Sequence, residues 1–537
     1  MMKTNFELYG WMKEAYLNMV IYRFKIMETY LKFGIGVILF LGIRSSYAEI
    51  NLPAVISDGM VIQQDTMITI WGWAESGETV TVKGSWMQNS KTTLADEKGE
   101  WQVKLMSPQA GGPYKIIISG KNKIVLTDIL SGEVWLASGQ SNMAMPLKQS
   151  EDAKAEITLA QFPDIHFFDV KHRMAETPQA DSEGKWEACT PDHIAEISAV
   201  AYYFARKIHT SLHVPVGVII ANKGGTPAES FVRREVLEQD TTLSKIFDLW
   251  TRWENEYPEA EEKYEKALDV WKKLKWGVSS NEKVKAAEPR MPLCVKNVRK
   301  PHRRPSALYN AMIWPHIPYV IKGVIWYQGE NNVNRPVQYQ KLFIALIRSW
   351  RKERHAPYLP FYYVQIAPWE RYVQENASLL REAQFRALSV PNTGMVVTSD
   401  IGNLKDIHPK NKKDVGERLA LWAQAKTYGQ KEIICSGPLY KSMKIEGDKI
   451  RLYFNYVGSG LIGKGDTTLT HFEIAGADKK YVKAEAVIDD STVVVYNKKI
   501  SNPLKVRFGW NLTSVPNFYN KEGLPASPFR TEPPTNP

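Results

Sequence analysis

The chain has 537 residues, which is too long for a single hydrophobic core and predicts roughly two to four domains. Its 44% hydrophobic and 24% charged residues are typical of a globular protein. The net charge is +11, but the basic residues are scattered and no nucleic-acid-binding motif is present, so a nucleic-acid partner is not expected. With three cysteines, Cys189, Cys294 and Cys435, at most one disulfide can form. No Cys/His group has zinc-ligand spacing, so we expect neither a metal nor another cofactor.

The N-terminus resembles a secretory leader. Phe33–Ile43 is an apolar run that follows Lys32 and precedes Ser46-Tyr47-Ala48, a small-x-small cleavage pattern. We therefore predict a signal peptide over residues 1–48, with Met27 as a second candidate start. The alternative is a membrane-anchoring helix, although the run is short for a bilayer span. The prediction is a secreted or periplasmic protein with no stable membrane anchor after cleavage.

Residues 49–130 predict an all-β module, because short alternating runs such as Met67–Trp73 and Glu78–Lys83 are separated by Gly, Asp and Asn turns. Residues 436–530 return to the same pattern, for example at Lys449–Phe454. We expect both segments to form sandwich-like modules, and the Pro-rich residues 531–537 to form a tail.

Between these modules, over residues 131–435, apolar strands alternate with helical segments. The predicted strands are 134–137, 214–220, 323–327, 361–366 and 394–398, and the predicted helices are 197–209, 339–353, 379–388 and 415–428. This alternation predicts a parallel sheet covered on both faces. A segment rich in Lys, Glu and Trp, about 243–285, predicts a helical insertion that forms either a hairpin over the site or an extension on the side of the domain.

Four polar segments follow predicted strands of this region. They are Gly139-Gln140-Ser141-Asn142, Ala221–Pro227 with Gly224-Gly225, Trp326–Asn332 and Asp400–Pro409. Because parallel strands share one carboxyl edge, the four segments can converge there. Serine alone is a poor nucleophile, so it needs a base and an oxyanion site. The segments offer an imidazole at His408, carboxylates at Asp400 and Asp406, side-chain amides and a glycine pair.

In this order, Gly-Gln-Ser-Asn, Gly-Gly-Thr, Trp-Tyr-Gln-Gly-Glu and Asp-Ile-His-Pro resemble the SGNH hydrolase superfamily, specifically the sialate O-acetylesterases. Three further segments carry the same resemblance: Pro305–Ile313, Leu380–Gln384 and Asn520–Phe529. It implies a flavodoxin-like three-layer α/β/α hydrolase domain. It also implies ester hydrolysis through an acyl-serine, with Ser141 as the nucleophile and His408 as the general base.

The resemblance implies oxyanion donors at the Ser141 N–H and at Gly224 or Gly225. The Gln328 side chain is a further donor, with Asn332 as its substitute. Two departures stand out. Position 405, where the superfamily has an aspartate, is Lys, so either Asp406 or Asp400 could orient His408, or a backbone carbonyl could do so. Gln328-Gly-Glu also stands where the superfamily more often has Gly-x-Asn.

Three further residues are candidates for substrate contact. Gln140 adjoins the serine, and Glu330 could brace the site or act as an acid. Arg381 could hold a substrate carboxylate in a bidentate contact or brace the start of its helix. The basic stretch Lys296–Arg304 predicts either a solvated loop or a second contact for an acidic substrate.

We therefore expect a serine esterase that removes O-acetyl groups from sialic acids or sialoglycans. One alternative is an acetylesterase that acts on another polysaccharide, such as xylan. A second is a carbohydrate-binding protein with a degenerate hydrolase domain.

Overall fold

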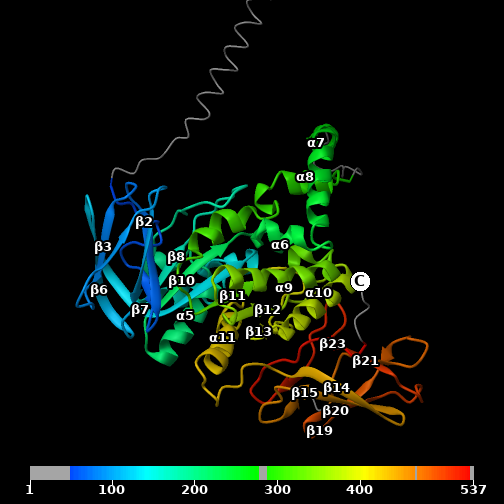
Figure 1. The fold of residues 1–537 in the computed structure, drawn as a ribbon. Helices are drawn as coiled ribbons and strands as arrows, with labels where there is room; N and C mark the ends of the chain where they lie inside the picture. The colour runs from blue at the N-terminus through cyan, green and yellow to red at the C-terminus, as the bar shows by residue number, and fades with distance from the viewer. Residues whose placement is uncertain (1–48, 277–286, 466–467, 533–537) are drawn as a thin grey trace, which may run out of the picture.

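The computed structural model describes residues 49–276, 287–465 and 468–532 (Figure 1). The predicted signal peptide, the end of the predicted insertion and the last five residues of the tail lie outside these ranges. Within them, no helix combines the length and the apolar character that a membrane span requires. The three cysteines are buried, and none of them forms a disulfide.

The N-terminal module is all-β, as predicted. Its strands are β1 (Val61–Gln63), β2 (Met67–Trp73), β3 (Thr79–Gly84), β4 (Lys91–Leu94), β5 (Glu100–Met106) and β6 (Gly111–Ser119). They pair antiparallel except for β1, which pairs parallel with β7 (Lys123–Gly139). In β5, exposed and buried residues alternate, and Trp101, Val103 and Leu105 point into the core. This period of two is the pattern from which the module was predicted.

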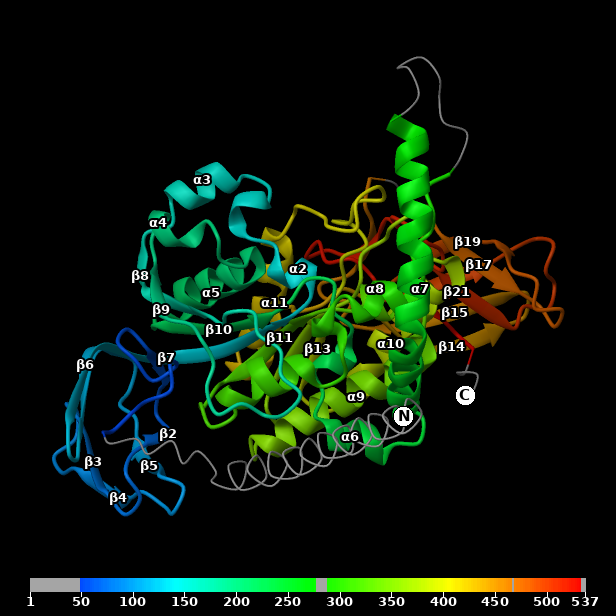
Figure 2. The same ribbon diagram turned by 90° about the horizontal axis from the view of Figure 1, so that it is seen from above.

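One long strand joins this module to the next domain. β7 (Lys123–Gly139) pairs antiparallel with β6 in its first half and parallel with two strands of the central sheet in its second half. Figure 2 shows it running from one domain into the other. The boundary predicted between residues 130 and 131 therefore falls inside a continuous strand, which fixes the two domains to each other.

The central sheet has the strand order β13-β12-β11-β7-β10-β8-β9, and only β9 is antiparallel to its neighbour. The strands besides β7 are β8 (Phe162–Asp169), β9 (Trp186–Cys189), β10 (Val216–Asn222), β11 (Gly323–Tyr327), β12 (Phe361–Val364) and β13 (Thr393–Val396). Without β8 and β9, the order is the 2-1-3-4-5 of flavodoxin-like folds. The order reverses between β7 and β11, which is where a ligand site is expected.

Helices cover both faces of this sheet, which confirms the three layers. On one face, Trp135 and Ala137 of β7 share a core with α5 (Ala199–Leu212) and α11 (Lys413–Trp422). On the other face, Val134 and Leu136 share a core with α9 (Pro336–Glu353) and α10 (Gln374–Arg386). Because both faces are buried, β10 and β11 are continuous apolar runs without alternation.

The predicted insertion is helical. α6 (Arg234–Gln239) precedes the long α7 (Lys245–Trp276), which projects from the domain, and α8 (Leu293–Val298) packs against α7 (Figure 2). Arg299 forms ion pairs with Glu261 and Glu265 of α7. These contacts fix the segment that follows α8 relative to the long helix.

The C-terminal module packs two small antiparallel sheets around a phenylalanine-rich core. One sheet contains β14 (Leu439–Glu446), β15 (Lys449–Asn455), β20 (Thr492–Tyr496) and β19 (Glu485–Asp489), and the other contains β18 (Val482–Lys483), β17 (Phe472–Ala475), β21 (Lys505–Phe508) and β23 (Phe529–Arg530). Arg530 binds both carboxylate oxygens of Glu382 in α10, at 3.0 and 2.8 Å, which ties this module to the α/β domain.

Candidate active site

Ser141 lies at the carboxyl edge of the sheet, where β7 ends and the short helix α2 (Ser141–Ala144) begins. The turn needs a glycine, because Gly139 has φ +141° and an added Cβ would lie 2.2 Å from the Tyr327 carbonyl oxygen. The backbone therefore leaves β7 sharply and places the serine hydroxyl above the strand ends, beside the order reversal in the sheet.

His408 reaches this serine from a segment 267 residues away in the sequence. Its Nε2 lies 2.9 Å from Ser141 Oγ, which is hydrogen-bond distance. Partial burial is the largest cause of a lowered His408 pKa. Asp406 raises this pKa, and Lys412 lowers it. The imidazole is therefore neutral near pH 7 and can accept the serine proton.

Asp406 and Asp400 differ clearly in their partners. Asp406 Oδ1 lies 3.6 Å from His408 Nδ1 and accepts the His408 backbone N–H at 2.9 Å. Asp400 is bound by Arg418 through two hydrogen bonds of 2.8 and 2.7 Å, and both side chains are largely buried. Only Asp406 therefore faces the imidazole, at a distance longer than a hydrogen bond.

Gly224 and Gly225 lie directly beside the serine. A Cβ at Gly224 would be 3.7 Å from Ser141 Cβ, and Gly225 has φ +71°, which a glycine adopts without strain. Within the described residues, the backbone N–H groups of Ser141 and Gly224 donate no hydrogen bond to another group. Both donors therefore remain available to an oxyanion at Ser141.

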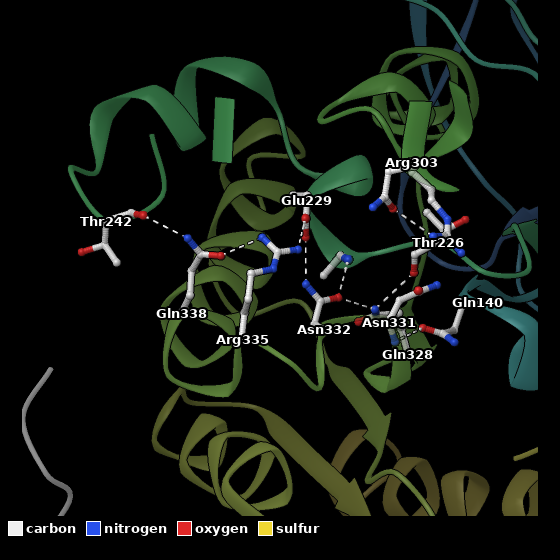
Figure 3. Close-up of polar contacts among 12 residues, drawn as sticks. Gln140, Thr226, Glu229, Thr242, Arg303, Gln328, Asn331, Asn332, Arg335 and Gln338 are labelled. Carbon is white, nitrogen blue, oxygen red and sulfur yellow. Dashed lines mark hydrogen bonds and ion pairs between the residues drawn. The ribbon is translucent and has the colours of Figure 1, made fainter. Parts of the chain in front are cut away.

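Gln328 and Asn332 are not available in this way, and the structure does not support their expected role as oxyanion donors. Gln328 Nε2 donates to Asn332 Oδ1 at 2.7 Å and to the Thr226 carbonyl at 3.3 Å (Figure 3). Asn332 Nδ2 donates to the buried carboxylate of Glu229 at 2.8 Å, and Asn332 Oδ1 also accepts the Ala228 N–H. The carboxylate fixes which way both amides point, so Gln328 Nε2 and Asn332 Nδ2 both donate within the fold, whereas the buried Gln328 Oε1 has no hydrogen-bond partner.

Asn331 carries a further candidate amide, which was not singled out from the sequence. It is half-buried, and its Nδ2 would lie 4.0 Å from a Cβ at Gly225. None of the described residues accepts a hydrogen bond from this Nδ2, whereas the Asn331 backbone N–H donates to Gln140 Oε1 at 3.3 Å. The sequence contains a pattern that points to Asn331. Gly329-Glu330-Asn331 is itself a Gly-x-Asn block, and it begins one residue after Gln328-Gly329-Glu330, the segment that was compared with that block.

Gln140 and Glu330 brace the site. Glu330 is buried, and its Oε1 accepts from Asn142 Nδ2 at 2.6 Å. Asn142 Nδ2 also donates to the Ile407 carbonyl at 3.0 Å, beside the imidazole. Asn142 thus ties the serine turn to the histidine loop, and Gln140 ties the same turn to Asn331.

Lys412 completes this brace and was not singled out from the sequence. Its buried Nζ donates to Asn142 Oδ1 at 2.7 Å and lies 5.4 Å from the centre of the Tyr327 ring. Burial lowers the pKa of this ammonium to about 7, although Glu330 and Asp406 oppose the shift. A titratable cation therefore lies directly beneath the serine turn.

Arg381 is placed elsewhere, and the structure does not support its expected contact with substrate. Only 3% of the residue is exposed, and its Nε and Nη1 donate to the backbone carbonyls of Ile366 and Asn511, at 3.3 and 3.0 Å. Burial lowers its pKa to about 10. The guanidinium joins α10 to the C-terminal module, which differs from the brace at the start of the helix that was the expected alternative.

The remaining groups form a compact chemical unit. A serine hydroxyl contacts a neutral imidazole, a carboxylate faces the far side of that imidazole, and two N–H groups and one amide are free beside the serine. This arrangement can transfer an acyl group to the serine and then to water.

Comparisons with known proteins agree with this chemistry. A family model described as "Carbohydrate esterase, sialic acid-specific acetylesterase" matches residues 296–424, which include Asn331 and His408. A Rattus norvegicus protein named sialate O-acetylesterase is 29% identical over 448 residues, covering 75% of this chain and 78% of the relative. A Homo sapiens protein of the same name is 26% identical over 535 residues, covering 90% of this chain and 93% of the relative.

Among solved structures, "Crystal structure of XAC1771, a novel carbohydrate acetylesterase from Xanthomonas citri" matches with a TM-score of 0.76 and 34% identity. The match covers 90% of this chain and 99% of that chain, so it includes both β modules as well as the α/β domain.

Proposed function

We propose, from the premise that this chain belongs to the sialate O-acetylesterase family of carbohydrate esterases, that it releases acetate from O-acetylated sialic acids through an acetyl-Ser141 intermediate. The observation that carries the proposal is the 2.9 Å contact between Ser141 Oγ and His408 Nε2 at the carboxyl edge of the sheet. The same contact argues against a carbohydrate-binding protein with a degenerate hydrolase domain.

In the first half-reaction, His408 Nε2 takes the proton from Ser141 Oγ while the oxygen attacks the acetyl carbonyl carbon. The resulting tetrahedral intermediate carries an oxyanion. We assign its hydrogen bonds to the Ser141 and Gly224 N–H groups and to Asn331 Nδ2. The imidazolium then gives its proton to the departing sugar oxygen, and the ester bond breaks to leave acetyl-Ser141.

In the second half-reaction, water replaces the sugar. The neutral imidazole takes a proton from this water, the hydroxide attacks the acetyl carbon, and the serine oxygen leaves with the proton that the imidazole held. Asp406 supports both steps, because its carboxylate favours the imidazolium electrostatically across 3.6 Å. The products are acetate and free enzyme.

The substrate assignment rests on the names of the mammalian relatives and the family description. The second candidate is another acetylated carbohydrate, because the Xanthomonas citri protein, at 34% identity, is named a carbohydrate acetylesterase without a stated sugar. The signal-peptide pattern predicted for residues 1–48 supports action outside the cytoplasm, in the periplasm or after secretion.

The test is acetate release by the purified protein from O-acetylated sialic acid and from acetylated xylan. The proposal predicts that kcat/KM is higher for the sialic acid. Rapid cleavage of xylan with little cleavage of the sialic acid would replace the substrate and leave the esterase mechanism intact. Acetate release from neither would contradict the proposed activity.

A further inference from the structure

Arg303 carries a buried positive charge that has no acidic partner. Only 7% of the residue is exposed, and burial lowers its pKa. Its Nη1 donates to Asn297 Oδ1 at 2.9 Å, and its buried Nε has no hydrogen-bond partner. Within the described residues, no carboxylate lies within ion-pair distance of this guanidinium. Arg381 is also buried but donates to two backbone carbonyls, whereas Arg303 donates a single hydrogen bond, to Asn297. A counter-charge from outside the chain would therefore stabilise Arg303, because burying an unpaired charge is costly.

The neighbouring arginines differ in this respect. Arg299 pairs with Glu261 and Glu265 of α7, and Arg304 pairs with Glu254 of α7 and with Glu176. The acidic residues that pair with this basic stretch therefore bind Arg299 and Arg304, on either side of Arg303 in the sequence. The same sequence that reads as a solvated loop contains one arginine that is left unpaired.

Arg303 also lies beside the active site. Its Nη2 would be 3.5 Å from a Cβ at Gly225, and Asn331 Nδ2 would be 4.0 Å from the same point. Apart from Gly225 and its two chain neighbours, these are the only atoms of the described residues within 4 Å of that point, so the guanidinium and the amide border the same position. Figure 3 shows Arg303 above Thr226, on the same side of the network as Gln140 and Asn331.

A second cation accompanies it. Lys223 directly follows β10, and its Nζ lies 3.0 Å from His172 Nδ1. Burial lowers the pKa of the neighbouring His302 to about 4, and the positive charges of Lys223 and Arg303 contribute to this shift. His302 is therefore neutral near pH 7, and its buried Nε2 has no hydrogen-bond partner. The described residues thus place two positive charges and a free ring nitrogen together.

We propose that Arg303, with Lys223 beside it, binds the carboxylate of the substrate, so that this esterase selects acidic acetylated sugars over neutral ones. This inference rests on the proposed function and names the group that the site recognises. A guanidinium binds a carboxylate through two parallel N–H groups. Arg303 Nη2 borders Gly225 and shares such an edge with Nε, which is buried and unpartnered. Gly224 lies beside Ser141, where the acetyl group would react, and the adjacent Gly225 lies beside Arg303, where the carboxylate would bind. The two proposed binding positions are therefore next to each other.

The experiment compares O-acetylated sialic acid with its methyl ester, which carries the same acetyl group without the negative charge. Acetate release is measured for wild type, Arg303→Gln, Arg303→Lys and Lys223→Met, and thermal unfolding checks that each variant is folded. We expect wild type to prefer the acid by about 10- to 100-fold in kcat/KM, as hydrogen bonds to a charged group provide. Arg303→Gln removes most of this preference by raising KM for the acid.

Arg303→Lys keeps the charge but loses the two-donor edge, so we expect an intermediate preference. Lys223→Met lowers the preference less than Arg303→Gln and remains informative if Arg303→Gln fails to fold. Arg304→Gln is the matched control, because this arginine already has acidic partners, and it keeps the wild-type ratio.

Equal loss on acid and methyl ester in Arg303→Gln and Lys223→Met would overturn the proposal, as would an unchanged ratio in both. A wild-type protein that cleaves a neutral acetyl ester but neither form of the sialic acid would instead contradict the proposed function, so the two failures are distinguishable.

Discussion

The Asp406 carboxylate lies 3.6 Å from His408 Nδ1, on the side of the ring opposite Ser141, and at the same time accepts the His408 backbone N–H. One carboxylate therefore shapes the loop that carries the imidazole and also faces its free nitrogen. The long distance implies an electrostatic contribution rather than a strong hydrogen bond.

Asp406→Asn should lower kcat without abolishing it. Carboxylate-to-amide changes in a short-contact triad cost on the order of 10⁴ in rate, and we expect on the order of 10² here because the contact is longer. The measurement is steady-state kinetics on O-acetylated sialic acid. Wild-type turnover in Asp406→Asn would show that the carboxylate has no part in the reaction.

Asp400→Asn serves as the contrasting variant. In the wild type, the Asp400 carboxylate binds Arg418 in a largely buried ion pair. The substitution leaves the guanidinium unpaired, so it should lower the free energy of unfolding by about 3 kcal/mol. Chemical denaturation measures this loss. A folded Asp400→Asn protein with a rate loss larger than that of Asp406→Asn would transfer the orienting role to Asp400.

The pH profile follows from the His408 pKa, which lies below its usual 6.5. The base must be neutral, so kcat/KM should stay high near pH 7 and fall as the pH drops through this lowered pKa. Asp406 raises this pKa, so Asp406→Asn should move the acid limb to lower pH. Lys412 lowers it, so Lys412→Met should move the limb to higher pH. An acid limb that is the same in all three proteins would contradict this account of the base.

Asn331 and Asn332 should behave differently despite being neighbours. Asn331→Ala removes a free amide beside the serine, so we expect kcat to fall by on the order of 10² to 10³ with little change in stability. Asn332→Ala breaks the contacts to Glu229 and Gln328, so its main effect should be a lower melting temperature. A reversed pattern would return the oxyanion role to Asn332.

Much of the fold could be predicted because local patterns determine it. The strand at 323–327 was predicted with its observed bounds, since a continuous apolar run between turn residues has few alternatives. The helix expected at 415–428 instead changes at Trp422 into a π-helical turn, Ala423–Thr427. That change depends on packing, which a periodic pattern does not contain.

The site could be predicted less completely. The contact between Ser141 and His408 could be predicted because strand-end polar segments meet at one edge of a parallel sheet, whereas their catalytic roles remain predictions. Arg381 was misplaced because the sequence does not show that its guanidinium lies against the C-terminal module. The internal contacts of Gln328 and Asn332 could not be predicted, because Thr226, which accepts from Gln328, and Glu229, which accepts from Asn332, lie about a hundred positions away and only the fold brings them near. The contact between Lys412 and Asn142 could not be predicted for the same reason, because the two residues are far apart in the sequence.

The most direct test of the account is a search for acetyl-Ser141 itself. Wild type and Ser141→Ala are mixed with O-acetylated sialic acid, quenched in acid within one turnover, digested and analysed by mass spectrometry. The account predicts one added acetyl group on the wild-type peptide that contains Ser141. It also predicts no such group on Ser141→Ala, whose turnover falls by ~10⁴ or more. Acetate release by Ser141→Ala at a rate near that of wild type, with no acetylated peptide in either protein, would contradict it.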